Sequence, residues 1–312
     1  MTRLNVSTSQ PQEWIELSRE SDALFGTRPW QMLLERSFGC RTIYVYNKAT
    51  GFAISVFRAG PFKIGYLGFP VGGGIGVSPS LSSFIDALCI ARLRGMPVCL
   101  RIPVSTFAQQ ADLDFPYQSN PETVIGNLQE WRPELISKKL RRDVRKSERS
   151  ELIVSEAAEP RVGDKLYEMY SRTVKRRGGA IRYNAAYFRE LIKLAKVQPR
   201  LRVLIAEDGT EIAGFVVIAR HGNTAYYLHG GANPMYQRFS PSDLLLNSAI
   251  HRAQQEGSQH FNLMASPSSQ PSLVRYKEKW GGITRELKTY TLPLRPSYRL
   301  FKTAEWVYRF IR

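Results

Sequence analysis

A dense run of basic residues offers the clearest binding chemistry in this sequence. Residues 138–149 carry seven lysines and arginines against two acidic residues. On a helix, Leu140 and Val144 would belong to an apolar stripe, and the cations would spread over the remaining faces. Such a helix predicts contact with the phosphates of a nucleic acid or a nucleotide-linked substrate. A solvated helix face with no ligand is the alternative.

A second basic cluster lies at 172–177, directly before Gly178-Gly179. It also suits phosphate contact, although cations at a helix end are favoured by the helix dipole alone. The residues that we expect to bind phosphate or substrate are Lys138, Arg141, Arg142, Arg145, Lys146, Arg176, Arg177 and Arg238.

The charge of the chain is concentrated in its second part. The 312 residues hold 44 Lys and Arg against 27 Asp and Glu, a formal net charge of +17. Nearly all of this excess lies after residue 130. A field of one sign over half of a molecule attracts polyanions, which include nucleic acids, nucleotides and anionic membrane surfaces.

The sequence lacks the residue patterns that several other kinds of chemistry require. The four histidines form no HxxxH motif and the three cysteines form no CxxC motif, so no metal site is predicted. The cysteines are expected to be free thiols in a reducing compartment. The glycines of 72–76 do not form a dinucleotide-binding fingerprint, and we expect an irregular loop there. No apolar stretch reaches the ~20 residues of a membrane span, and the N-terminus lacks the apolar core of a secretory signal.

Apolar periodicity predicts two halves with a similar order of elements, in an α/β or α+β fold. Each half has three strands followed by a helix and a further strand, which suggests a structural duplication. The expected ranges are helix 12–38, strands 41–47, 51–58 and 62–69, helix 80–94 and strand 97–102; then helices 164–176 and 185–196, strands 201–206, 212–220 and 224–229, a helix from Pro241 to a stop at Gly257, strand 260–264, helix 271–280, strand 284–292 and helix 297–311.

The order of two helices, three strands, a helix and a strand resembles an N-acyltransferase domain of the GNAT type. More specifically, the chain resembles the FemAB-like family and the related BioF2-like acyltransferases. The motifs that carry this resemblance are Arg142-x-x-Arg145-Lys146-x-Glu148, Tyr167-x-x-Tyr170, Asp208-Gly209, Tyr226-Tyr227-x-His229-Gly230-Gly231-Ala232, Pro241-x-x-Leu244-Leu245, Phe261-Asn262-Leu263 and Tyr276-Lys277-x-Lys279-Trp280-Gly281, with Arg28-Pro29-Trp30 in the first half.

This resemblance implies two tandem GNAT-like domains, each with a central mixed sheet flanked by helices. We expect the first domain to comprise 1–135 together with 293–312, whose helix packs back onto it. The second, acyltransferase domain is expected to comprise 136–292. The C-terminal helix also carries Arg299, Lys302, Arg309 and Arg312 on one side, so contact with a membrane surface is the alternative for it.

The resemblance also implies the residues that take part in acyl transfer. Lys277 is the candidate for stabilising the developing oxyanion, and a surface lysine is the alternative. Asn262 stands where the family often has Asp, and it would orient an amine only as a neutral group. His229 or Asp243 could assist proton transfer, although a hydrogen-bonded strand histidine is the plainer interpretation of His229.

One departure from the family bears on the acyl donor. CoA-dependent GNAT enzymes typically begin their central helix with a glycine-rich loop whose N–H groups hold the pyrophosphate. Here that stretch is 237–242, with Ser240 at the first glycine position and Pro241 lacking an N–H. The sequence therefore favours aminoacyl-tRNA as the donor, as in the FemAB-like aminoacyltransferases.

The resulting prediction is a cytoplasmic aminoacyltransferase without a cofactor, for which peripheral contact with the inner face of the membrane stays open. It would use tRNA and an amine on a peptide, a cell-wall precursor or a small metabolite. The alternatives are a transferase that uses acetyl-CoA or acyl-CoA on an amino sugar or polysaccharide precursor, and a non-catalytic nucleic-acid-binding module. The sequence leaves the oligomeric state open.

Overall fold

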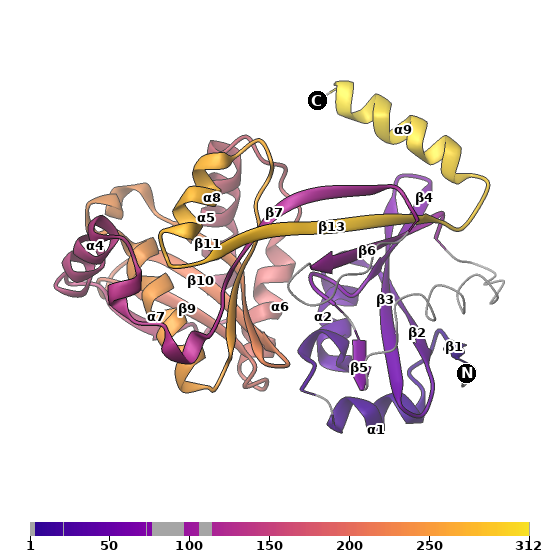
Figure 1. Cartoon of the computed structure of the whole chain (residues 1–312), viewed down its shortest axis with the longest axis horizontal. Coiled ribbons are helices and arrows are strands. Elements are labelled where there is room, and N and C mark those ends of the chain that lie inside the picture. Colours follow the sequence, from indigo (N-terminus) through magenta and orange to yellow (C-terminus); the bar gives the residue numbers. More distant parts are fainter. Residues whose placement is uncertain (1–3, 21, 73, 77–96, 106–113, 312) are drawn as a thin grey trace. The chain divides into compact units, whose positions relative to one another are not determined.

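The computed structural model describes residues 4–20, 22–72, 74–76, 97–105 and 114–311. The chain divides into two compact units (Figure 1). One comprises Met1–Ser119 with Glu286–Arg312, and the other comprises Asn120–Arg285. The expected helix 80–94 and Cys89 lie outside the described residues. Cys40 and Cys99 are buried and unpaired, as expected of free thiols.

The first unit is a mixed sheet with helices. Its strands lie in the order β1-β2-β3-β4-β6-β13, β5 pairs with β3, and the β4–β6 pair is parallel. The expected loop at 72–76 is therefore wrong in part, because Gly74–Gly76 forms strand β5. The bounds are β1 Asn5–Ser7, α1 Gln12–Glu20, α2 Arg28–Phe38, β2 Arg41–Tyr46, β3 Thr50–Ala59, β4 Phe62–Leu67, β5 Gly74–Gly76, β6 Cys99–Ser105, β13 Ile283–Pro293 and α9 Tyr298–Ile311.

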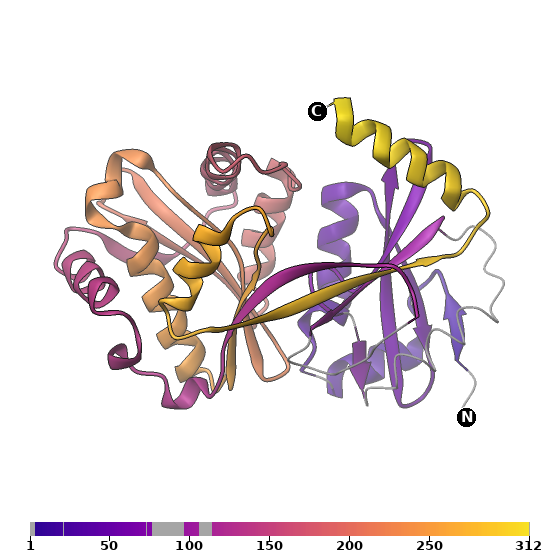
Figure 2. The same ribbon diagram turned by 45° about the horizontal axis from the view of Figure 1, so that its top comes forward.

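The C-terminal helix α9 packs within the first unit, beside β4 and β6 (Figure 2). Phe301 is 5% exposed and joins Ile64 and Cys99 in an apolar cluster. Arg101 on β6 forms an ion pair with Glu305, at 2.6 Å. Phe301 is the one residue of 298–305 that is buried in this contact, and Leu300 beside it is 68% exposed.

The second unit is also a mixed sheet, with strand order β7-β12-β11-β10-β9-β8. Its β11–β12 pair is parallel and the other described pairs are antiparallel. The bounds are β7 Tyr117–Ile125, α4 Lys138–Glu148, β8 Ile153–Glu156, α5 Val162–Arg176, α6 Ala185–Ala195, β9 Leu201–Glu207, β10 Ile212–His221, β11 Thr224–Ala232, α7 Pro241–Gln255, β12 His260–Ala265 and α8 Pro271–Glu278.

Both faces of this sheet are covered, so its central strand β10 is apolar almost throughout. Successive side chains point to opposite faces. Phe215 contacts Phe188 of α6 on one face, whereas Val216 and Ile218 join the cluster that holds α7 and the apolar stripe of α4. The basic helix α4 therefore packs on the α7 face of the sheet (Figure 1).

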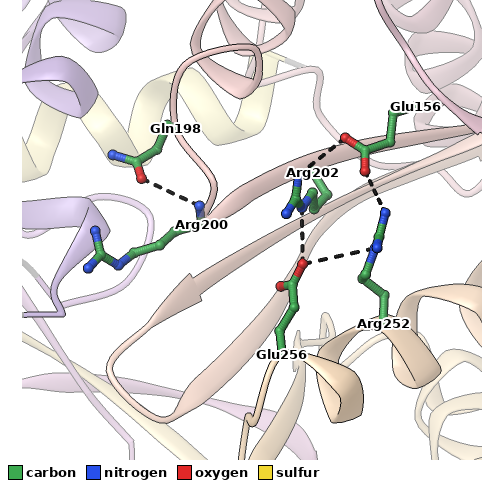
Figure 3. Close-up of polar contacts among 6 residues, drawn as sticks. All are labelled: Glu156, Gln198, Arg200, Arg202, Arg252 and Glu256. Carbon is green, nitrogen blue, oxygen red and sulfur yellow. Dashed lines mark hydrogen bonds and ion pairs between the residues drawn. The ribbon is translucent and has the colours of Figure 1, made fainter.

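Alternating charges connect one edge of the sheet to α7. Arg202 on β9 contacts Glu156 of β8 and Glu256, and Arg252 of α7 contacts the same two carboxylates (Figure 3). Two arginines and two glutamates neutralise one another here. This part of the unit thus contributes little to the positive field.

The division between the units differs from the expected boundaries at 135/136 and 292/293. It falls within β7 and β13. Residues 120–135 pack in the second unit, because β7 pairs with β12 and Trp131 donates a 2.9 Å hydrogen bond to the carbonyl of Trp280. Trp131 and Trp280 lie 149 residues apart in sequence, a separation over which local periodicity gives no signal.

Candidate active site

The candidate site of the second unit lies where two parallel strands separate. β11 and β12 pair only from Thr224 to Tyr226 and from His260 to Asn262. Beyond this point β11 carries an extra residue, Leu228, and β12 bends at Met264, whose φ is +64°. A cavity of about 620 Å³ lies between the diverging strands and is closed by the end of α5, the start of α7 and α8.

Lys277 of α8 lies in the wall of this cavity and is only 6% exposed. Its Nζ donates to the carbonyl oxygens of Met264, at 2.7 Å, and Ala265, at 3.3 Å. The pKa of Lys277 is lowered to about 7, mainly by burial and also by Arg177, whereas Glu122 opposes the shift. The ammonium and the free amine are thus both accessible near neutral pH.

Asn262 is buried beneath the cavity rather than open to it. Its Nδ2 donates to the buried carboxylate of Glu122, at 2.9 Å, and its Oδ1 accepts from the N–H of Met264, at 2.7 Å. A neutral amide is required here because it must donate to one partner and accept from the other. The side chain therefore fixes the bend of β12, and it contacts the cavity only through that bend.

His229 lines the cavity from β11 inside an aromatic cage. Rings of Tyr170, Tyr183, Tyr187 and Phe188 lie 4.4–5.9 Å from its ring, and the hydroxyl of Tyr187 lies 3.0 Å from its Nε2. Burial lowers the pKa of His229 to about 3, so the imidazole is neutral at physiological pH.

The start of α7 is poorly suited to hold a pyrophosphate. Pro241 has no N–H, and the N–H groups of Asp243 and Leu244 are already bonded to the carbonyl oxygen of Ser240. Asp243 also places a carboxylate at this end of the cavity, where its Oδ1 accepts a 2.8 Å hydrogen bond from Tyr276. Phosphate binding at a helix N-terminus needs free N–H groups and a favourable field, and both are reduced here.

Comparison with known protein families decides the class of the second unit. Residues 136–278 match the model of the acetyltransferase (GNAT) domain family. The second unit is a GNAT acyltransferase domain. The helix-helix-strand-strand-strand-helix-strand order expected from the sequence is confirmed.

Solved structures extend the likeness to the whole chain. FemX has a TM-score of 0.66 at 12% identity, with 95% of this chain and 99% of that chain covered. L-PGS from Bacillus licheniformis has a TM-score of 0.60 at 15% identity, with 98% and 97% covered. A tandem GNAT protein from the clavulanic acid biosynthesis pathway has a TM-score of 0.54 at 10% identity, with 95% and 100% covered.

These likenesses show the tandem GNAT fold, and they confirm the FemAB-like resemblance at the level of the fold. A comparison with curated proteins gave no match.

The predicted phosphate-binding residues fall into two groups in the GNAT domain. Arg176 and Arg177, at the end of α5, line the cavity, and Arg182 joins them there. The α4 cations and Arg238 do not line it. The α4 cations are mostly exposed on the α7 face, and Arg238 stacks on Phe239, with its guanidinium 4.6 Å from the ring centroid.

Three residues of the GNAT domain's site escaped the sequence reasoning. Glu122 precedes the expected domain boundary, and Tyr276 was noted only as part of a motif. Ser266 lines the cavity, is 1% exposed, and its hydroxyl has no partner among the described residues. A buried polar group without a hydrogen-bond partner is costly, which sets Ser266 apart from the other residues that line the cavity. What identifies these residues is that they lie near Lys277, and this proximity is known only once the fold is known.

Two further observations concern the described part of the chain alone. It contains no group of three or more His, Cys, Asp or Glu residues arranged to hold a metal ion. None of its helices is both long and apolar enough to cross a membrane.

Proposed function

We propose that this protein transfers an aminoacyl group from aminoacyl-tRNA to an amine. The observation that carries the proposal is a GNAT cavity that holds a buried lysine but lacks a pyrophosphate cradle at the start of α7. A pyrophosphate cradle is needed to hold CoA in the usual way, whereas an aminoacyl ester has no pyrophosphate to be held. The fold likeness to FemX and L-PGS is consistent with such a donor.

In the reaction, the acceptor nitrogen attacks the ester carbonyl of the donor. The amide C–N bond forms while the ester C–O bond breaks; the nitrogen loses a proton and the released ribose hydroxyl gains one. Two of the three N–H groups of the Lys277 ammonium are held by backbone carbonyls, which leaves one for the developing oxyanion in the cavity. With a pKa of about 7, Lys277 can also supply the proton that the leaving oxygen needs.

The electrostatics of the second unit support a polyanionic donor. Arg176, Arg177 and Arg182 are exposed residues at the cavity, where the phosphates next to the ester of a tRNA would lie. The exposed cations of α4 offer a second surface for phosphates farther along the tRNA. Since this donor is made in the cytoplasm, the proposal includes a cytoplasmic location.

Side-by-side transfer assays test the donor. The full chain is incubated with a pool of amine acceptors and either a mixed pool of tRNAs charged with labelled amino acids or labelled acetyl-CoA. Amide-linked label from charged tRNA, with binding that weakens steeply as salt rises, is the expected result. Label from acetyl-CoA alone would overturn the proposal.

CoA-dependent acyl transfer is the second candidate, because the matching family model describes an acetyltransferase domain. Its acceptor would be an amino sugar or a polysaccharide precursor. It predicts a rise in the melting temperature with acetyl-CoA that depends only weakly on salt. Binding of tRNA without transfer from either donor would instead indicate a non-catalytic nucleic-acid-binding module.

A further inference from the structure

We propose that Asp243 and Tyr276 form an ammonium subsite that receives the free α-amino group of the aminoacyl donor. This inference rests on the proposed function and adds to it the class of acyl group. The site would select α-aminoacyl donors over donors of the same size that lack the positive charge.

The subsite is a carboxylate with one oxygen fixed and one available. Asp243 is half-buried at the start of α7 and lines the cavity. The hydroxyl of Tyr276 donates to its Oδ1 at 2.8 Å, which fixes the orientation of the carboxylate. Within the described ranges of the chain, no group donates a hydrogen bond to its Oδ2.

The surroundings of Asp243 favour a cationic ligand. Burial raises the pKa of this carboxyl, and Asp143 adds to the shift, whereas Tyr276 and Lys279 lower it. A half-buried carboxylate with an open oxygen is stabilised when an ammonium binds it, through a charge-assisted hydrogen bond. Anionic groups would meet the same carboxylate with repulsion.

Two considerations assign the subsite to the donor rather than to the acceptor. The acceptor amine must be neutral to attack, and a carboxylate beside it would stabilise its unreactive ammonium form. The α-amino group of the donor does not react, so its charge can serve binding. In an α-amino ester this group lies next to the carbonyl. Tyr276 is bonded to Asp243, and the next residue, Lys277, is the proposed oxyanion donor. Both Asp243 and Lys277 therefore line the same cavity.

The test compares two donors that differ at one group. Transfer by the full chain is measured from aminoacyl-tRNA and from the corresponding α-hydroxyacyl-tRNA, in which a hydroxyl replaces the ammonium. The wild-type protein should prefer the aminoacyl donor by about tenfold to a hundredfold in kcat/KM, the range of one charge-assisted hydrogen bond.

Asp243→Asn keeps an acceptor for Tyr276 and removes the charge. It should lower kcat/KM for the aminoacyl donor by a similar factor and leave the hydroxyacyl donor within about threefold, so that the preference disappears. Asp208→Asn is the matched control, because Asp208 also accepts a hydrogen bond from a tyrosine, Tyr236, but lies outside the cavity. It should keep the preference.

The possible results distinguish a failure of the ammonium subsite from a failure of the proposed function. Equal loss with both donors in Asp243→Asn would mean a structural role for Asp243 and overturn the subsite. Equal rates with both donors in the wild-type protein would overturn it as well, while the proposed function would stand. Absence of transfer from either tRNA by the wild-type protein would overturn both.

Discussion

The Nζ of Lys277 donates a 2.7 Å hydrogen bond to the carbonyl oxygen of Met264, the residue at which β12 bends. The left-handed backbone of Met264 is held from the other side, because its N–H is bonded to Asn262. The bend that opens the cavity and the lysine that enters it therefore depend on each other. Without the bend, a lysine buried to this degree would lack the partners that water normally provides.

Replacing Lys277 should affect catalysis more than binding. Lys277→Met keeps the length and apolar stem of the side chain but removes the donor. We expect kcat for aminoacyl transfer to fall by about 10²–10³, the cost of losing one oxyanion donor, with KM for the donor changed by less than about threefold. Steady-state kinetics of the full chain measure both constants.

Lys193→Met changes an exposed lysine of α6 that lies outside the cavity, and it is the control for Lys277→Met. A higher KM at unchanged kcat would contradict the oxyanion role.

The buried His229 should make the protein sensitive to acid. Its pKa is lowered from 6.5 to about 3, so between these pH values the unfolded chain binds a proton that the folded chain does not. The free energy of unfolding should therefore decrease as the pH falls from about 6.5 towards 3. His229→Gln removes this contribution, and its urea midpoint should depend less on pH than that of the wild-type protein.

His260→Gln is the control, because it also replaces a histidine with glutamine, at a half-buried position on β12. It distinguishes the effect of His229 from the effect of removing any histidine. The two variants are compared over the same pH range. A slope for His229→Gln that equals the wild-type slope would show that His229 does not stay neutral in the folded state.

Asn262 stands where the family often has Asp, and its hydrogen bond to the buried carboxylate of Glu122 accounts for the amide at this position. Exchanging the acid and the amide between these two positions tests this explanation. Asn262→Asp would place a second carboxylate 2.9 Å from that of Glu122 and remove the hydrogen bond between them. We expect the free energy of unfolding to drop by about 3 kcal/mol, as for other unpaired buried charges. Adding Glu122→Gln restores one acid and one amide, and it should recover at least half of the loss. Denaturant titrations measure both, and an additive double variant would argue against direct coupling.

The sequence predicted local elements well, but it brought forward only some of the residues that line the cavity. Helices such as α5 and strands such as β10 follow from periodic apolar residues, because each pattern is complete within a short stretch. β7 escaped because its first residues are exposed and polar, and its buried end is specified by pairing with β12. The domain boundary was displaced for the same reason.

Among the site residues, the sequence brought forward Lys277 and His229, and the cavity contains both. It gave no hint that Glu122 lies beside Asn262, since a buried carboxylate is recognised only by its surroundings in the fold. It also grouped the α4 cations with those of Arg176 and Arg177. The apolar stripe of α4 packs towards α7, and this places its cations away from the cavity.

That position makes a separate prediction for α4. Arg145 and Lys146 are exposed neighbours on this helix. If they contact tRNA phosphates, the double change Arg145→Gln with Lys146→Gln should weaken tRNA binding and reduce the dependence of log K on log salt by about 2, one counterion per cation. Because neither residue lines the cavity, kcat at saturating donor should stay within about twofold of the wild-type value. Filter binding over a salt series and single-donor kinetics give both numbers.

Lys193→Gln with Lys196→Gln, which removes two exposed cations at the end of α6, is the control and should leave the slope unchanged. Equal slopes in the α4 variant and the wild-type protein would make α4 a solvated helix face, and the tRNA would then have to bind through the arginines at the cavity alone.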